Sequence, residues 1–365
     1  MDKENILCPG ETIKELLETN HYTQQDLADK LNMDLKTVNE ILNGKAPITV
    51  ETAIKLEMIF NVDAIFWNNL EFNYRKKLKE FKEQEYIEQE YNEIKQVYKE
   101  MIKRNLVVDT KDKYKIIENF KKFMEITSID SLKDEYYKIA CRKSNTKNMD
   151  INYLMVWIQI GLRKAREIEV KEYNKEKILS KIDEIRELTL LNNQQIARKK
   201  LISICSECGI VVNFEKSMPN TAIYGIAKWL NSTTPFIQIS DRGKNVATFW
   251  FSFMHELGHI IKGRKKMIFL DMDHNIIDND KDIQFLKDVE EAKADKFSRD
   301  VLIPEIEYKK NLENIEIKNI KQQDIIDFSR KVRIAPCIIA GRIKHDKEIY
   351  DNKVLNSFNI KMEFE

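Results

Sequence analysis

In residues 11–70, apolar side chains recur every three or four positions, which is the spacing of amphipathic helices. Thr23 and Asp34 stand where helix N-caps are expected, and Asn32 stands at a turn that requires a left-handed backbone. This part of the chain is therefore expected to form an all-α domain. The predicted helices cover residues 12–18, 24–31, 35–42, 50–60 and 64–70.

Residues 73–193 keep the helical spacing but carry many more charges. The pattern predicts a long charged helix over 73–103 and further helices within 113–190, with amphipathic stretches at 116–126 and 153–164. This region is expected to be a helical middle region.

The pattern changes after residue 193, where a helix over 195–207 ends at Gly209. Short apolar runs separated by polar clusters predict strands of a small sheet, and longer periodic segments predict helices around it. This part is therefore expected to be an α+β domain. The predicted strands are 210–214, 224–230, 235–240 and 267–270; the predicted helices are 246–261, 288–302, 321–332 and 336–343; a polar loop is expected over 271–283.

Length and composition indicate how many domains to expect and whether the chain would enter a membrane or form disulfides. With 365 residues, 42% hydrophobic and 33% charged, the chain is long enough for more than one domain with a core. No secretory pattern stands at its N-terminus, and the longest apolar run, 151–161, is too short for a bilayer, so a cytoplasmic protein that does not enter membranes is expected. The lone Cys205-x-x-Cys208 pair is interpreted as a helix end rather than a metal site, and no disulfide framework is expected from the five scattered cysteines.

Residues 255–259 read His-Glu-Leu-Gly-His within an apolar stretch. On a helix, His255 and His259 lie on one face, so both imidazoles can bind one metal ion. Glu256 is placed to act on water bound to that ion. The motif predicts a zinc hydrolase.

Catalytic zinc usually has three protein ligands and one open position. Lys265 stands where a metzincin would have its third histidine, and His274 lies in a polar loop. Glu291 is the preferred third ligand, because it shares a helix face with Asp295, which can hydrogen-bond a ligating histidine. The adjacent Glu290 is the rival ligand.

A mechanism follows from these roles. Zinc (Zn²⁺) lowers the pKa of its bound water toward neutrality. Glu256 would take a proton as that water attacks a peptide carbonyl and would pass it to the leaving amine. Tyr224, Arg342 and His345 are candidates to stabilise the oxyanion, and the sequence does not decide among them.

The C-terminal part resembles the ImmA/IrrE family of zinc metallopeptidases. The resemblance runs from about residue 200 onward and includes the segments 249–259, 291–297, 301–304 and 338–342. It implies that His255, His259 and Glu291 bind zinc and that Glu256 is the catalytic base. Gly263 stands where many relatives carry a further histidine. Some relatives cleave a repressor or another regulator, which implies a regulatory protein as substrate.

Residues 23–44 resemble the XRE family of helix-turn-helix proteins, and residues 59–71 resemble antitoxins of the HigA type. The resemblance implies an operator DNA, bound as a dimer or with help from other basic groups, and a cognate toxin as a further partner. Gln24 would contact a phosphate, and the recognition helix would span 35–43. The residues expected to bind DNA are Gln24, Leu35, Lys36, Thr37, Asn39, Asn43 and Lys45.

The charge of this domain opposes the DNA interpretation. Residues 1–70 hold six lysines, no arginine and twelve acidic residues, a net charge of 6 − 12 = −6, whereas phosphate binding needs basic groups. A helical bundle that contacts protein is therefore an alternative.

These expectations define a multi-domain fold and a leading function. An XRE-type helix-turn-helix domain over 1–72, a helical region over 73–193 and an α+β, zincin-like metallopeptidase domain over 194–365 would form a zinc endopeptidase fused to a DNA-binding regulator. Two alternatives are an antitoxin-type regulator whose peptidase-like domain is a sensor or scaffold, and a zinc-binding protein without turnover.

Overall fold

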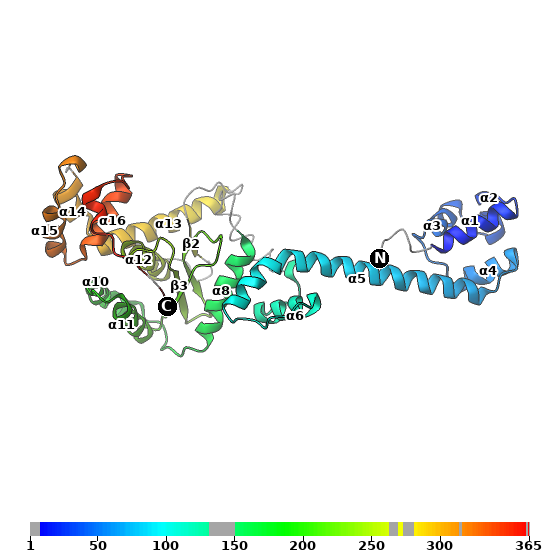
Figure 1. Cartoon of the computed structure of the whole chain (residues 1–365), viewed down its shortest axis with the longest axis horizontal. Helices are drawn as coiled ribbons and strands as arrows, with labels where there is room; N and C mark the ends of the chain where they lie inside the picture. Colours follow the sequence, from blue (N-terminus) through cyan, green and yellow to red (C-terminus); the bar gives the residue numbers. More distant parts are fainter. Residues whose placement is uncertain are drawn as a thin grey trace. The chain divides into compact units, whose positions relative to one another are not determined.

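The computed structural model describes residues 8–130, 150–262, 269–272, 281–313, 316–362 and 364. The chain forms two compact units, Met1–Phe120 and Lys121–Glu365 (Figure 1). Cys141, Gly263, Lys265 and His274 lie outside the described residues. No helix in the described part of the chain combines the length and the apolar character that a membrane span requires.

The N-terminal unit contains a helix at each of the five predicted places, and the two N-caps expected from the sequence, Thr23 and Asp34, are formed. Thr23 accepts a hydrogen bond from the Asp26 backbone N–H while Asp26 accepts one from that of Thr23, and Asp34 accepts from the backbone of Thr37. Asn32 has the left-handed backbone that the turn requires, with φ 53°. The helices are α1 Pro9–Thr19, α2 Gln24–Leu31, α3 Leu35–Leu42, α4 Val50–Phe60 and α5 Ala64–Lys103.

The prediction of separate helices over 64–70 and 73–103 is wrong, because α5 is one helix of 40 residues. No proline or glycine interrupts the junction, and the Arg75 Nε lies 2.6 Å from the Glu71 Oε1, so an ion pair joins successive turns across it. The helix α6, Lys113–Met124, follows.

The C-terminal unit contains a four-stranded sheet, as predicted. The strand order is β1-β3-β2-β4; β1 runs parallel to β3, while β2 runs antiparallel to both β3 and β4. The strands are β1 Val211–Glu215, β2 Ile223–Trp229, β3 Pro235–Ser240 and β4 Phe269–Met272. The start of the predicted strand over 267–270 lies outside the described residues.

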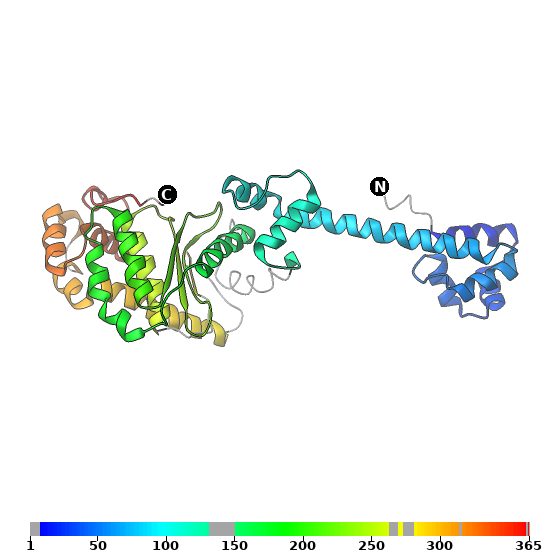
Figure 2. The same ribbon diagram turned by 90° about the horizontal axis from the view of Figure 1, so that it is seen from below.

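Helices cover both faces of this sheet (Figure 2). The metal-motif helix α12, Val246–Lys262, packs on β2 and β3, and α8, Ile151–Arg166, packs on β1 and β3. Gln238 on β3 faces α8: its Nε2 donates to the Trp157 carbonyl at 2.8 Å, and a Cβ on Gly161 would lie 1.3 Å from its Oε1. The helix α8 lies within residues 73–193, which were expected to form a helical middle region. Part of that region therefore packs directly on the sheet.

The remaining helices complete the shell of the unit. The thiols of Cys205 and Cys208 are buried where α11 ends, burial raises the pKa of both, and Gly209 has φ 81°, so the interpretation of this pair as a helix end is confirmed. The helices are α9 Lys175–Ser180, α10 Ile182–Leu188, α11 Gln194–Glu207, α13 Lys281–Leu302, α14 Glu305–Tyr308, α15 Gln322–Val332, α16 Pro336–Asp346 and α17 Lys353–Asn356, with a π-turn over Lys309–Glu313 and a 3₁₀ turn over Ile317–Asn319.

Candidate metal centre and nucleic-acid interface

The polar residues of the metal motif lie in an apolar interior. His255, Glu256 and His259 are 6%, 0% and 2% exposed, because the apolar residues of α12 bury the helix between the sheet and α13. A Cβ on Gly258 would lie 3.1 Å from the Ala294 Cα, so the absence of a side chain there lets α12 and α13 approach closely. This approach brings Glu291 of α13 to the histidines of α12.

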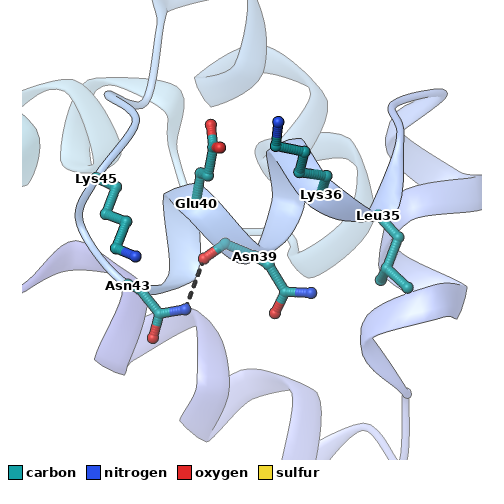
Figure 3. A pocket seen from close by; sticks show the side chains of 6 residues that line it. All are labelled: Leu35, Lys36, Asn39, Glu40, Asn43 and Lys45. Atoms are coloured by element: carbon teal, nitrogen blue, oxygen red, sulfur yellow. Dashed lines mark hydrogen bonds between the residues drawn. The ribbon is translucent and has the colours of Figure 1, made fainter.

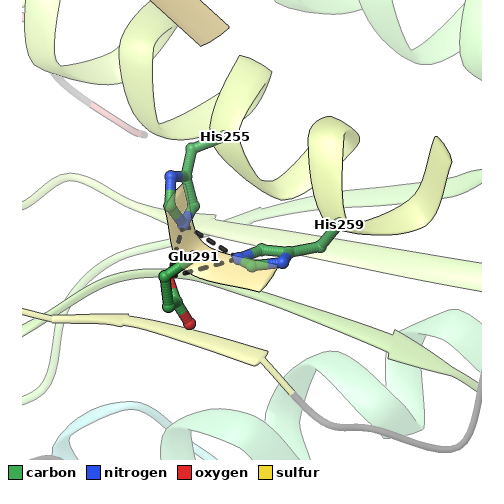
Figure 4. Close-up of side chains that lie close together, drawn as sticks. All are labelled: His255, His259 and Glu291. Atoms are coloured by element: carbon green, nitrogen blue, oxygen red, sulfur yellow. Dashed lines mark hydrogen bonds and ion pairs between the residues drawn. The ribbon is translucent and has the colours of Figure 1, made fainter. Parts of the chain in front are cut away.

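Three potential ligand atoms converge at this point (Figure 4). The Nε2 atoms of His255 and His259 lie 2.9 Å apart. The Glu291 Oε2 lies 3.1 Å from the first nitrogen and 3.4 Å from the second. Within the described ranges, these three residues form a group that could hold a metal ion.

The chemistry of these donors fits a zinc ion. The His255 Nδ1 lies 2.8 Å from the Asp295 Oδ1, and a carboxylate can only accept a hydrogen bond, so the proton of a neutral His255 is on Nδ1. Its Nε2 then presents a lone pair toward His259 and Glu291. Ligands at about 2.0–2.1 Å from a tetrahedral zinc are about 3.3 Å apart, which is close to the observed separations.

The two candidates for the third ligand lie in different surroundings. Glu291 lies with the histidines, whereas the buried Glu290 accepts a hydrogen bond from the Lys293 Nζ at 2.8 Å and does not belong to the group of potential ligands. The spacing argument that favoured Glu291 over Glu290 agrees with this arrangement.

Glu256 lies against a glycine that the sequence did not single out. A Cβ on Gly225 of β2 would lie 2.8 Å from the Glu256 Cγ and 2.9 Å from its Oε1. The pairing of β2 with β4 shifts register between Ile223 and Gly225. The missing side chain at Gly225 therefore leaves the space that the Glu256 carboxylate occupies.

The three oxyanion candidates have other contacts. The Arg342 Nε lies 2.5 Å from the Asp346 Oδ2, and its Nη2 lies 3.2 Å from the Glu305 Oε2. His345 contacts the same Asp346, whose hydrogen bond raises the pKa of the imidazole. The ring of Tyr224 lies 5.2 Å from the guanidinium of Arg242.

In the N-terminal unit, a hollow of about 380 Å³ follows the outer face of α3 (Figure 3). Asn43 donates from its Nδ2 to the Asn39 carbonyl at 2.8 Å, which fixes its side chain at the end of the helix. The lining residues are Leu35, Lys36, Asn39, Glu40, Asn43 and Lys45.

This hollow brings together most of the residues expected to bind DNA. Thr37 lies outside its lining and donates from its hydroxyl to Asp34 at 2.7 Å, so it stabilises the start of α3. Gln24 is the first residue of α2 and also lies outside the hollow. Glu40 was not among the expected residues and also lines the hollow, where its position four residues after Lys36 puts it on the same helix face.

Comparison with known proteins gives two family matches. Residues 13–67 match the family described as Helix-turn-helix, and residues 205–318 match the family described as IrrE N-terminal-like domain, a peptidase M78 family. The second match contains α12, α13 and all of the proposed zinc ligands.

Two individual proteins resemble the N-terminal part. The "Uncharacterized HTH-type transcriptional regulator YddM" of Escherichia coli (strain K12) is 31% identical over 71 residues, which is 20% of this chain and 76% of that protein. The solved structure of an addiction module antidote protein of a HigA family from Coxiella burnetii is 33% identical and covers 23% of this chain and 92% of that one, with a TM-score of 0.21.

Proposed function

This chain belongs to the helix-turn-helix transcriptional regulators and carries an IrrE N-terminal-like domain in its C-terminal part, and on that basis we propose that it is a zinc-dependent endopeptidase that cleaves a regulatory protein. The observation that carries the proposal is the convergence of His255, His259 and Glu291 beside the buried Glu256. A protein that only bound zinc would not need a buried acid next to its ligands.

Each residue of the site would have a separate role in peptide-bond hydrolysis. When bound, zinc would supply a Lewis acid that lowers the pKa of water at the open position. Asp295 holds the His255 proton on Nδ1, so the lone pair of a neutral His255 is on Nε2, the atom that would bind the metal. Glu256 follows His255 directly in α12 and would take a proton from the attacking water and deliver it to the leaving amine.

Metal analysis of the purified full chain tests the site. We expect about one zinc per chain in the wild type. In Glu291→Gln the zinc affinity should be at least about 100-fold lower, because only two protein ligands would remain. Glu290→Gln is the matched control, with the same substitution one residue away, and is expected to keep its zinc. Equal zinc binding by the two variants would refute the assignment of Glu291.

We further propose that the N-terminal domain binds operator DNA through the face of α3. Lys36 and Lys45 lie at the hollow, where they can contact phosphates beside bases read by Asn39 and Asn43. The salt dependence of binding is the slope of log affinity against log salt concentration. Removing either lysine should make this slope shallower by about one, because one phosphate contact is lost.

This DNA prediction is measured by fluorescence anisotropy with DNA from upstream of the gene, at two salt concentrations. Lys36→Ala and Lys45→Ala are expected to bind more weakly at low salt and with a shallower salt dependence. Lys14→Ala on α1, where Lys14 is paired with Glu11, is the control and should bind like the wild type. The proposal fails if all three variants behave alike.

A second candidate is an antitoxin-type regulator that binds a cognate toxin, with a peptidase-like domain that senses a signal without turnover. The observation that favours it is the net charge of −6 in residues 1–70, which suits protein contact better than DNA contact. Co-expression of the full chain with the product of the adjacent gene decides: a stable complex formed by both the wild type and Glu256→Gln, without cleavage in either case, supports the second candidate.

A further inference from the structure

The charge of the chain changes sign shortly after the start of α5. Residues 75–82 carry five basic side chains and one acidic side chain, a net charge of 5 − 1 = +4, whereas residues 1–70 carry −6. We call residues 75–82 the basic segment of α5. Its basic residues are Arg75, Lys76, Lys77, Lys79 and Lys82, and its acidic residue is Glu80.

The basic segment belongs to an uninterrupted helix, because α5 runs without a break from Ala64 to Lys103. This helix packs on α1 and α4 and continues beyond α1–α4 (Figure 1). A helix rises about 1.5 Å per residue, so the eight residues of the basic segment cover about 12 Å. The packing of α5 on its neighbours therefore also fixes the direction in which the basic segment runs.

Tyr74, the residue before the basic segment, lies beside the end of α3. A Cβ on Gly44 would lie 2.6 Å from the Tyr74 Oη and 2.7 Å from the Cys8 Sγ. Gly44 follows α3, has φ 66° and directly precedes Lys45, which lines the hollow at the outer face of α3 (Figure 3). The basic segment therefore begins about one tyrosine side chain away from the end of the face that α3 would present to DNA.

The lysines of the basic segment can reach an anion in solvent. Lys76, Lys77, Lys79 and Lys82 are all exposed. The Lys79 Nζ lies 3.9 Å from the Glu83 Oε1, which is the outer limit of an ion pair. Among the residues that the structure describes, Lys76, Lys77 and Lys82 have no ion-pair partner.

Charges are segregated along α5, which a role in solubility alone does not explain. A solvated helix face usually mixes the two signs of charge. In α5, the basic segment is followed by residues 83–93, which hold five acidic residues and no basic one. The positive charge is thus concentrated in the part of the exposed helix that comes next to α3.

We propose that the basic segment of α5 binds the phosphate backbone of the duplex against which α3 lies. This inference rests on the proposed DNA binding through α3 and adds a second element to it. A duplex carries one negative charge per about 1.7 Å of its axis, so a segment about 12 Å long can contact several phosphates. These contacts supply the basic groups that residues 1–70 lack, and they carry no sequence information directly.

Fluorescence anisotropy of the full chain tests the inference with two duplexes of equal length, one from upstream of the gene and one of scrambled sequence. Lys76→Gln/Lys77→Gln should weaken binding at low salt at least about tenfold and make the slope of log affinity against log salt shallower by about two. Both effects should appear on both duplexes, because phosphate contacts do not depend on the base sequence.

Lys99→Gln/Lys111→Gln is the matched control, because it also removes two exposed lysines of the N-terminal unit. Lys99 lies on α5 itself, about 33 Å beyond Lys77 at 1.5 Å per residue. The control should bind like the wild type, and thermal melts should show that both variants are folded.

The possible results separate this inference from the proposed function. If the wild type binds DNA and Lys76→Gln/Lys77→Gln has the same affinity and salt slope, the basic segment does not contact DNA, while binding through α3 stands. Equal weakening by the two double variants, or a loss confined to the upstream duplex, would also overturn the inference. A wild type that binds neither duplex at low salt would overturn both proposals.

Discussion

Replacing Glu256 by glutamine is expected to lower the rate of peptide-bond hydrolysis by about 1,000-fold while zinc stays bound. Glutamine keeps the size of the side chain but cannot take the proton of the attacking water. The side chain is fully buried, follows His255 directly in α12, and does not belong to the three converging residues. The Glu256→Gln variant should therefore lose turnover without losing the metal.

Cleavage of a peptide library prepared from the proteins of the native host measures this effect, with zinc analysed in the same samples. His259→Ala is the comparison variant, because it should lose both zinc and activity. If Glu256→Gln cleaves at the rate of the wild type, Glu256 is not the base. If it loses zinc together with activity, its role is structural rather than chemical.

Gly225→Ala should lower turnover by about 100-fold, the cost typical of moving a reacting group by about 1 Å. The new methyl group would lie within 3 Å of the Glu256 Cγ and Oε1 and of the Ile239 Cδ1. All three are side-chain atoms, so the strand can stay in place while the carboxylate is displaced. Zinc content and thermal stability should change little.

Gly341→Ala is the control for packing strain. A Cβ at Gly341 on α16 would lie 2.8 Å from the Ala247 Cβ, so this substitution also crowds α12, but near its first residues rather than at Glu256. We expect Gly341→Ala to lower stability without a selective loss of turnover. Equal activity of the two variants would show that Gly225 does not position the base.

Local signals in the sequence predicted much of this structure. The helices of the N-terminal unit follow from apolar spacing and from side chains that satisfy helix ends, such as Thr23 and Asp34. The strands around the sheet follow from short apolar runs between polar clusters. His255, Glu256 and His259 were predicted together because they share one helix, and Glu291 was predicted because its helix face also carries Asp295.

Features that depend on contacts between distant segments were missed. Gly225 lies against Glu256 through the packing of a strand on a helix 31 residues later, for which no local pattern exists. The packing of Gly161 on Gln238, which places α8 on the sheet, is of the same kind. The continuity of α5 was missed for a different reason: the rise in charge after residue 73 was interpreted as the start of another region, but nothing there breaks the helix.

The most direct test compares the protein N-termini in native host cells that produce either the wild-type chain or Glu256→Gln at equal levels. A zinc endopeptidase of narrow specificity predicts a small set of new internal N-termini that is present with the wild type and absent with Glu256→Gln. Identical sets of N-termini in the two strains, under conditions in which both proteins are folded and bind zinc, would contradict peptidase activity in this chain.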